Sequence, residues 1–127
     1  MTQEDKKMEG GRPEILNDKA VAKEARALKK LFRRIEGDDK RKLIGGMLDE
    51  AAFLKVAMQQ AKAELLAEGL SIETKNASQH FVKAHPAVQV YEKYNKQYTA
   101  IINALIPQLP PEEQKTVSRL AALRNNG

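Results

Sequence analysis

The sequence predicts an all-α fold, in which a long antiparallel helical hairpin has a basic N-terminal helix and a short C-terminal helix and assembles into a ring. Two observations favour this class. Aromatic residues make up only 5% of the 127 residues, whereas β-sandwiches depend on aromatic and β-branched side chains. Apolar residues also recur at alternating steps of three and four along two long segments, which is the period of an amphipathic helix. The length suits one domain, or one helical unit that completes its core with copies of itself.

Composition and motifs exclude several kinds of activity. The chain has no cysteine, which excludes disulfides, thiolate catalysis and cysteine-bound zinc or iron–sulfur clusters. It also lacks a phosphate-binding P-loop, a nucleophile elbow and a paired-histidine zinc motif, so we expect no enzyme activity, no cofactor and no metal. The apolar runs are short and the N-terminus has no apolar core, which predicts a soluble, cytoplasmic protein without membrane contact.

The first elements are a polar arm and a helix. Residues 1–17 are polar and show no periodicity, which predicts a disordered arm. The helix is expected over 18–36, from a cap at Asn17 or Asp18 to a stop at Gly37. Its apolar stripe and its row of basic residues lie about 200° apart at 100° per residue. The basic row should therefore face outward.

Positive charge is concentrated in residues 19–42, which contain ten Lys and Arg against four Asp and Glu in a chain of net charge +5. A basic block beside a neutral body is typical of a polyanion-binding element, so 18–42 is the predicted DNA-binding unit. A solvated basic helix explains the same pattern. The candidate DNA-contacting residues are Lys19, Lys23, Arg26, Lys30, Arg33, Arg34, Lys40, Arg41 and Lys42.

The helical hairpin is predicted over 43–106. Its first helix should run from about 40 to 68, with Asp38 and Asp39 as caps, and it carries an unbroken heptad seam. A second apolar row flanks this seam, so one neighbouring helix cannot cover both rows. We therefore expect a partner copy on the second row. The second row consists of Phe53, Val56, Gln60, Ala63 and Ala67.

A polar linker is expected over 70–85, and Pro86 then opens the second helix of the hairpin, which Pro107 ends. His80 and His85 lie in this linker, five residues apart, and are expected to have a local role rather than to bind metal. The tyrosines of the second helix are expected in the core, with base stacking as the alternative. The candidate oligomerisation residues are Met47, Leu54, Met58, Leu65, Tyr91, Tyr94, Tyr98, Ile101 and Leu105.

The C-terminal segment 107–127 is predicted to form a short helix with acidic residues in its first turn. Val117, Leu120 and Leu123 form its expected buried edge. A helix of this length is not stable alone in water, so it needs a docking surface.

The order of features from Leu31 to Leu123 matches a known pattern. Its parts are Leu31, Phe32 and Ile35 in the first helix; Ala51, Ala52, Leu54, Ala61, Glu64 and Leu65 before Glu68-Gly69; Asn76 and Lys83-Ala84-His85-Pro86-Ala87; and Leu105-Ile106, Pro110 and Ser118-Arg119-Leu120. In this order of features the chain resembles the small subunit of tailed-phage terminases.

This resemblance implies a non-enzymatic DNA-packaging factor in the cytoplasm of an infected bacterial host. It implies a ring of roughly eight to ten copies that binds double-stranded viral DNA. It also implies recruitment and regulation of the terminase large subunit, which holds the ATPase and nuclease, and we expect that contact in 107–127. Two other hypotheses stay open: a dimeric helical regulator that binds DNA or a partner helix, and an enzyme subunit whose active site another chain completes.

Overall fold

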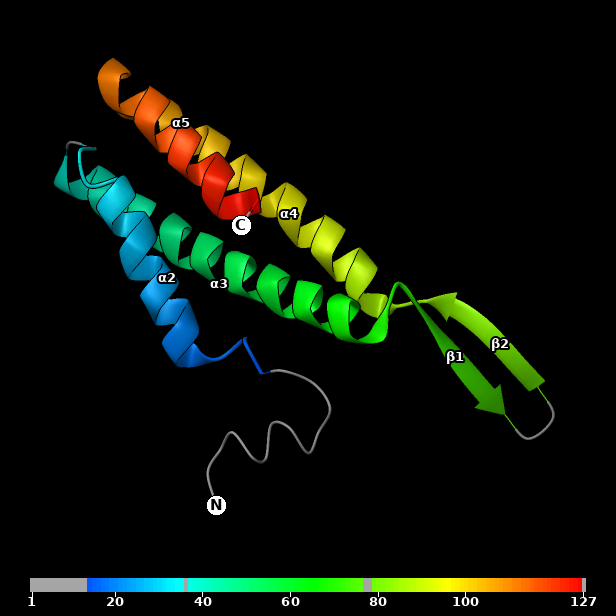
Figure 1. Ribbon diagram of the computed structural model, residues 1–127. Coiled ribbons are helices and arrows are strands. Elements are labelled where there is room, and N and C mark those ends of the chain that lie inside the picture. Colours follow the sequence, from blue (N-terminus) through cyan, green and yellow to red (C-terminus); the bar gives the residue numbers. More distant parts are fainter. Residues whose placement is uncertain (1–13, 36, 77–78, 127) are drawn as a thin grey trace.

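The computed structural model describes residues 14–35, 37–76 and 79–126, and this part of the chain is mostly helical (Figure 1). Its elements are α2 (Asp18–Leu31), α3 (Asp38–Glu68), β1 (Ser71–Asn76), β2 (Gln79–Ala84), α4 (Pro86–Leu105), a 3₁₀ turn (Ile106–Gln108) and α5 (Pro111–Asn126). Most of the segment predicted as a disordered arm lies outside the described residues. At its end, Ile15 and Leu16 are half-buried and donate their backbone N–H groups to Gln60 Oε1 at 2.6 and 3.0 Å.

Helix α2 begins where predicted, with Asn17 Oδ1 accepting the N–H of Ala20, but it ends at Leu31, before the expected stop. The early end has a packing reason: the chain turns after Leu31, and this turn still buries Phe32 and Ile35. Gly37 is the N-cap of α3 rather than the stop of α2, and its φ of 101° suits a residue without a Cβ.

Two acidic residues begin α3. Asp38 and Asp39 were expected to cap the helix, but they lie inside its first turn, and the cap residue makes no side-chain hydrogen bond. Both carboxylates still stabilise the helix at this position, because negative charge near a helix N-terminus interacts favourably with the helix dipole.

The segment predicted as a linker forms a β-hairpin, so that prediction is wrong. Strands β1 and β2 pair antiparallel, from Ser71 opposite Ala84 to Asn76 opposite Gln79. The physical reason is that each strand contains residues that favour β structure, and only two residues separate the strands. Figure 1 shows the hairpin extending beyond the end of the helices.

Helix α4 confirms the prediction of a proline-initiated helix. Pro86 occupies its first turn, and His85 before it has the extended conformation that a following proline imposes (φ −64°, ψ 131°). The helix then runs antiparallel to α3, and the two form the helical hairpin (Figure 1).

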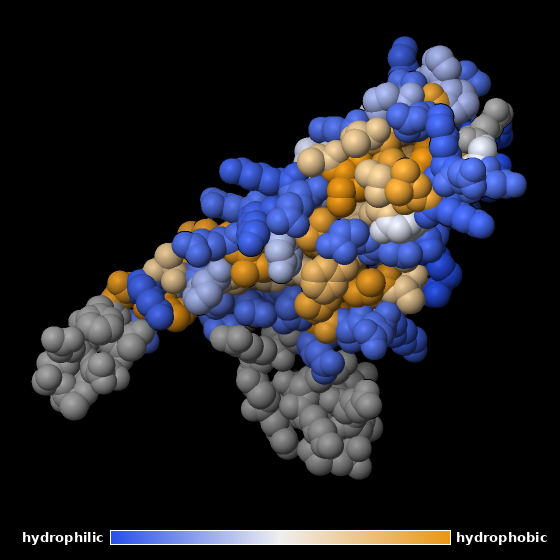
Figure 2. Space-filling model, turned by 180° about the vertical axis from the view of Figure 1, so that it is seen from behind, coloured by the Kyte–Doolittle hydropathy of each residue, from blue (hydrophilic) through white to orange (hydrophobic). Residues whose placement is uncertain are grey.

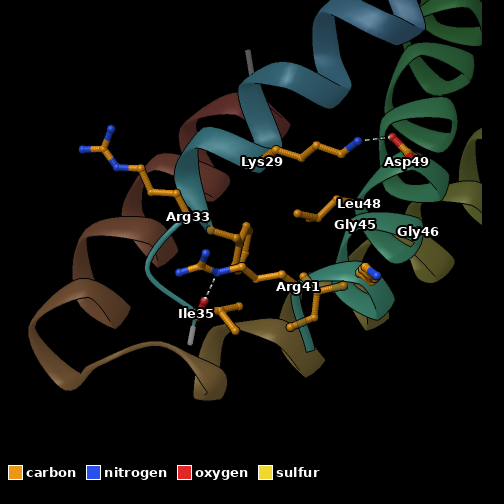
Figure 3. Close-up of a pocket in the computed structure, with 11 residues that line it drawn as sticks. Lys29, Arg33, Ile35, Arg41, Gly45, Gly46, Leu48 and Asp49 are labelled. Atoms are coloured by element: carbon orange, nitrogen blue, oxygen red, sulfur yellow. Dashed lines mark hydrogen bonds and ion pairs between the residues drawn. The ribbon is translucent and has the colours of Figure 1, made fainter. Parts of the chain in front are cut away.

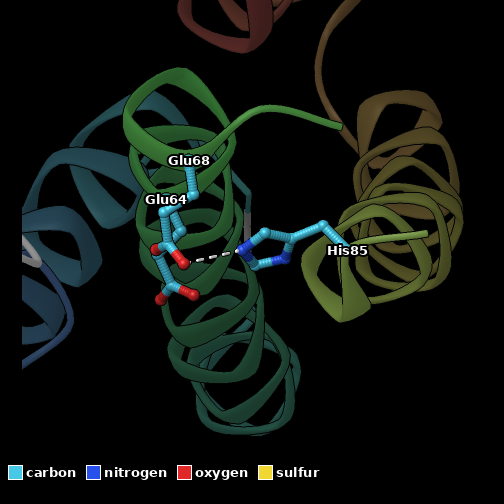
Figure 4. Close-up of side chains that lie close together, drawn as sticks. All are labelled: Glu64, Glu68 and His85. Carbon is cyan, nitrogen blue, oxygen red and sulfur yellow. Dashed lines mark hydrogen bonds and ion pairs between the residues drawn. The ribbon is translucent and has the colours of Figure 1, made fainter. Parts of the chain in front are cut away.

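The core lies on two faces of α3. Helix α4 contributes Tyr98, Ile102 and Leu105 to one cluster of buried residues, and α2 contributes Ala25 and Leu28. Looking along α3, Figure 4 shows α2 on one side and α4 on the other. Helix α2 thus packs on α3 within one chain, while Phe53 and Ala67 of the predicted second row stay exposed.

Helix α5 follows the 3₁₀ turn and docks through Val117, which is buried in the core. Leu120 was predicted to be buried but is 38% exposed, because it borders a hollow between α2 and α5. The side chain of Leu123 lies outside the described set. In the part of the chain that the structure covers, no helix has a stretch that is long and apolar enough to cross a membrane.

Some apolar surface stays exposed near the base of the β-hairpin, where Figure 2 shows apolar side chains beside the strands. Leu66, in the last turn of α3, and Leu70, just after this helix, are 80% and 72% exposed. Val82 of β2 is also exposed.

Candidate nucleic-acid interface

All nine basic residues predicted to contact DNA have exposed side chains. Lys19, Lys23, Arg26 and Lys30 are on α2, opposite the side where Ala25 and Leu28 are buried. The 3.6-residue period explains this separation, because positions two residues apart point in nearly opposite directions around the helix. The basic row therefore faces outward, as its spacing predicts.

The turn after α2 and the first turns of α3 enclose a hollow of about 580 Å³, which we call the basic hollow. Its cationic residues are Lys29, Arg33, Arg41 and Lys42, and Asp49 is the one acidic residue among the described residues that line it. The hollow also has apolar lining residues, of which Phe32, Ile35, Ile44 and Leu48 are buried. It thus combines a buried apolar floor with a positively charged rim.

Two polar contacts hold the rim in place (Figure 3). The Lys29 ammonium forms an ion pair with Asp49 at 2.9 Å, which joins α2 to α3. Arg41 donates from Nε to the backbone oxygen of Ile35 at 3.1 Å. A guanidinium has five N–H donors, so this bond fixes Arg41 and leaves donors for an anion. Within the described ranges, Arg41 and Lys42 make no ion pair with a carboxylate.

A second hollow, of about 430 Å³, lies between α2 and α5. Its basic residues are Lys30, Arg33 and Arg34, and the last of these forms an ion pair with Glu113 of α5 at 3.6 Å. Arg33 borders both hollows. It therefore links the basic row of α2 to the basic hollow.

The structure does not bring all the predicted residues together. Four of them line neither hollow: Lys19, Lys23 and Arg26 extend the charged face along α2, and Lys40 is exposed in the first turn of α3. Sequence reasoning missed Lys29, Gly45 and Gly46 as members of the site. The available signal was two adjacent glycines inside a long helical pattern, where glycine is unfavourable.

Eight of the nine candidate oligomerisation residues belong to the core of one chain or pack against it, and Leu65 is the exception. Four of them, Leu54, Met58, Tyr98 and Leu105, are buried in the core cluster. The other five are half-buried: Met47, Leu65, Tyr91, Tyr94 and Ile101. Their apolar surface is thus used mainly for intramolecular packing, and the tyrosines are packed against the core, as expected.

Glu64, Glu68 and His85 form a cluster at the junction of α3 and α4 (Figure 4), and their potential ligand atoms lie within 4.8 Å of one another. His85 Nδ1 accepts the N–H of Ala87 at 3.0 Å, so the ring proton is on Nε2 and is donated to Glu68 Oε1 at 3.2 Å. A metal bound at Nε2 would require the ring proton to move to Nδ1, which would break the bond from Ala87. In the structure the cluster joins the end of α3 to the start of α4 by hydrogen bonds. This is a local role for His85, of the kind predicted.

No protein-family model matches the chain, and no curated protein or solved structure shows a significant match to it. Among the described residues, the main candidate site is the exposed basic face of α2 together with the basic hollow beside it.

Proposed function

We propose that the protein is the non-catalytic small subunit of a phage terminase, which binds double-stranded viral DNA during genome packaging. The observation that carries this proposal is the exposure of all nine predicted basic side chains on α2, the following turn and the first turn of α3. Phosphate contacts by Lys and Arg supply most of the affinity of sequence-independent DNA binding. A continuous basic face on a helix suits this role.

Two further features support the same proposal. The basic hollow places additional cations beside the row on α2, so one DNA strand can meet cations from two helices. The predicted helices that carry the resemblance are also present in the structure, from the basic helix through the hairpin to α5.

In this proposal, a ring of roughly eight to ten copies forms and recruits a large subunit that holds the ATPase and nuclease. The exposed residues Leu66, Leu70 and Val82 are available for contacts between copies. The segment 107–127 contacts the large subunit, and it does so through the exposed side of α5, because Val117 is already used in the core.

A second candidate is a dimeric DNA-binding regulator. One observation favours it: α2 packs on α3 within the chain, so residues of a single chain already form a buried core. The basic face serves DNA equally well in this case, and the two candidates differ in assembly and in partner.

Two measurements test the proposal. Light scattering should give a mass of roughly eight to ten copies, whereas a dimer favours the regulator. Binding to labelled duplex DNA should weaken steeply as salt is raised, with each phosphate contact adding about −0.9 to the log–log slope. Absence of duplex binding at low salt would refute both candidates.

A further inference from the structure

Two adjacent glycines, Gly45 and Gly46, lie inside α3, although glycine is the least favourable residue for a helix interior after proline. Their backbone conformation does not require glycine. Positive φ among the described glycines occurs at Gly37 and Gly69, at the two ends of α3, where a residue without a Cβ is needed.

Packing within the chain does not require the glycine pair either. A Cβ built at Gly45 or at Gly46 would meet no heavy atom within 4 Å. Both positions thus border open space, and alanine would fit there without displacing a neighbour. The pair leaves room beside α3 for something outside the chain.

The open space beside the pair is the basic hollow. Its volume of about 580 Å³ falls within the range of small-molecule pockets, roughly 300–1,000 Å³. The cations on its rim outnumber the one carboxylate, Asp49, which is already paired with Lys29. The hollow therefore favours an anion rather than an apolar or a basic group.

We propose that a phosphate of the DNA backbone enters the basic hollow and lies against α3 at Gly45 and Gly46. Arg41 and Lys42 contact it from the rim, and the missing Cβ atoms allow the close approach. This inference rests on the proposed DNA-binding function. It adds that the DNA strand passes from the outward face of α2 to the basic hollow. Arg33 borders both hollows and so connects this phosphate to the next along the strand.

The glycine pair allows a test in which stability and binding move in opposite directions. Replacing both glycines by alanine should raise the melting temperature by several degrees, because alanine favours helices and nothing is displaced. The same double variant should weaken binding to a labelled DNA duplex by about tenfold at fixed salt. The combination Gly45→Leu and Gly46→Leu fills more of the hollow and should weaken binding further.

A matched control is Ala100→Leu, which adds bulk at an exposed position of α4, away from the hollow. It should leave duplex binding unchanged. Inorganic phosphate at constant ionic strength should not displace the duplex, since a free phosphate lacks the contacts along α2. Binding of inorganic phosphate by a wild-type protein that binds no duplex would show that the hollow takes a small anion and would overturn the DNA assignment.

The outcomes separate this inference from the proposed function. If both glycine variants bind the duplex like the wild type, while reversing the charges of Arg26 and Lys30 abolishes binding, the hollow is not part of the interface and the inference fails alone. If the wild-type protein binds no duplex, the proposed function fails with it.

Discussion

His85 and Glu68 are joined by a hydrogen bond of 3.2 Å between Nε2 and Oε1, across the point where the β-hairpin leaves the helices. His85 also caps α4 through Nδ1, and its backbone N–H bonds the oxygen of Leu70 at 2.9 Å. The buried His85 therefore joins three parts of the chain: its side chain bonds the end of α3 and the start of α4, and its backbone N–H bonds the base of the hairpin.

Replacing His85 by alanine should lower the free energy of unfolding by about 1–2 kcal/mol, because loss of a helix cap and of buried packing both cost stability. His85→Asn should lose less, since asparagine can cap α4. Denaturant unfolding followed by circular dichroism measures both variants. An unchanged midpoint for the alanine variant would contradict this role.

Zinc should not stabilise the protein. A metal bound at His85 Nε2 would require the ring proton to move to Nδ1, with loss of the bond between Nδ1 and Ala87. Melting curves with and without excess zinc should coincide. A rise in melting temperature that disappears in Glu64→Ala would show instead that the cluster binds metal.

Reversing two charges of the basic row, with Arg26→Glu and Lys30→Glu, should abolish duplex binding and leave the oligomer intact. If both residues contact phosphates, the salt slope of any remaining binding should fall by about 2, because each contact contributes about 0.9. Fluorescence anisotropy across a salt series measures this change.

The matched control for charge reversal is Lys93→Glu with Lys96→Glu, which makes the same change in net charge at exposed positions of α4. It should weaken binding only slightly. Equal losses in both pairs would mean that net charge alone controls DNA binding.

Core and surface leucines of α3 should respond differently to truncation. Leu54→Ala should cost about 2–5 kcal/mol, because the side chain is buried in the core cluster. Leu66→Ala removes an exposed side chain and should change stability by less than about 0.5 kcal/mol. If Leu66→Ala reduces the mass measured by light scattering, Leu66 lies between copies; if Leu54→Ala is as stable as the wild type, the described core is wrong.

The contact with a large subunit is best tested on the surface of α5, because deleting the helix would also remove Val117 from the core. Lys115→Glu with Arg119→Glu changes two exposed residues and should leave the fold unchanged. We expect this pair to reduce stimulation of the partner ATPase. Full stimulation by the variant would place the contact elsewhere.

The amino-acid sequence by itself determined the helices and much of their ends. Apolar spacing places α3 and α4 within two residues of their predicted bounds, and Pro86 marks the start of α4. The outward direction of the basic row also followed from spacing alone. These features depend on neighbours within about one helical turn, which the sequence shows directly.

Only the tertiary structure decided which faces meet. Three contacts join residues that are many positions apart in the sequence. Helix α2 packs on α3, Lys29 forms an ion pair with Asp49, and Glu68 bonds to His85. The β-hairpin likewise depends on pairing between two strands, and local polarity alone indicated a loop. The basic hollow beside Gly45 has the same origin, since it exists only where the turn after α2 packs against α3. Such contacts arise because burying apolar surface selects among many chain arrangements that local preferences leave equally open.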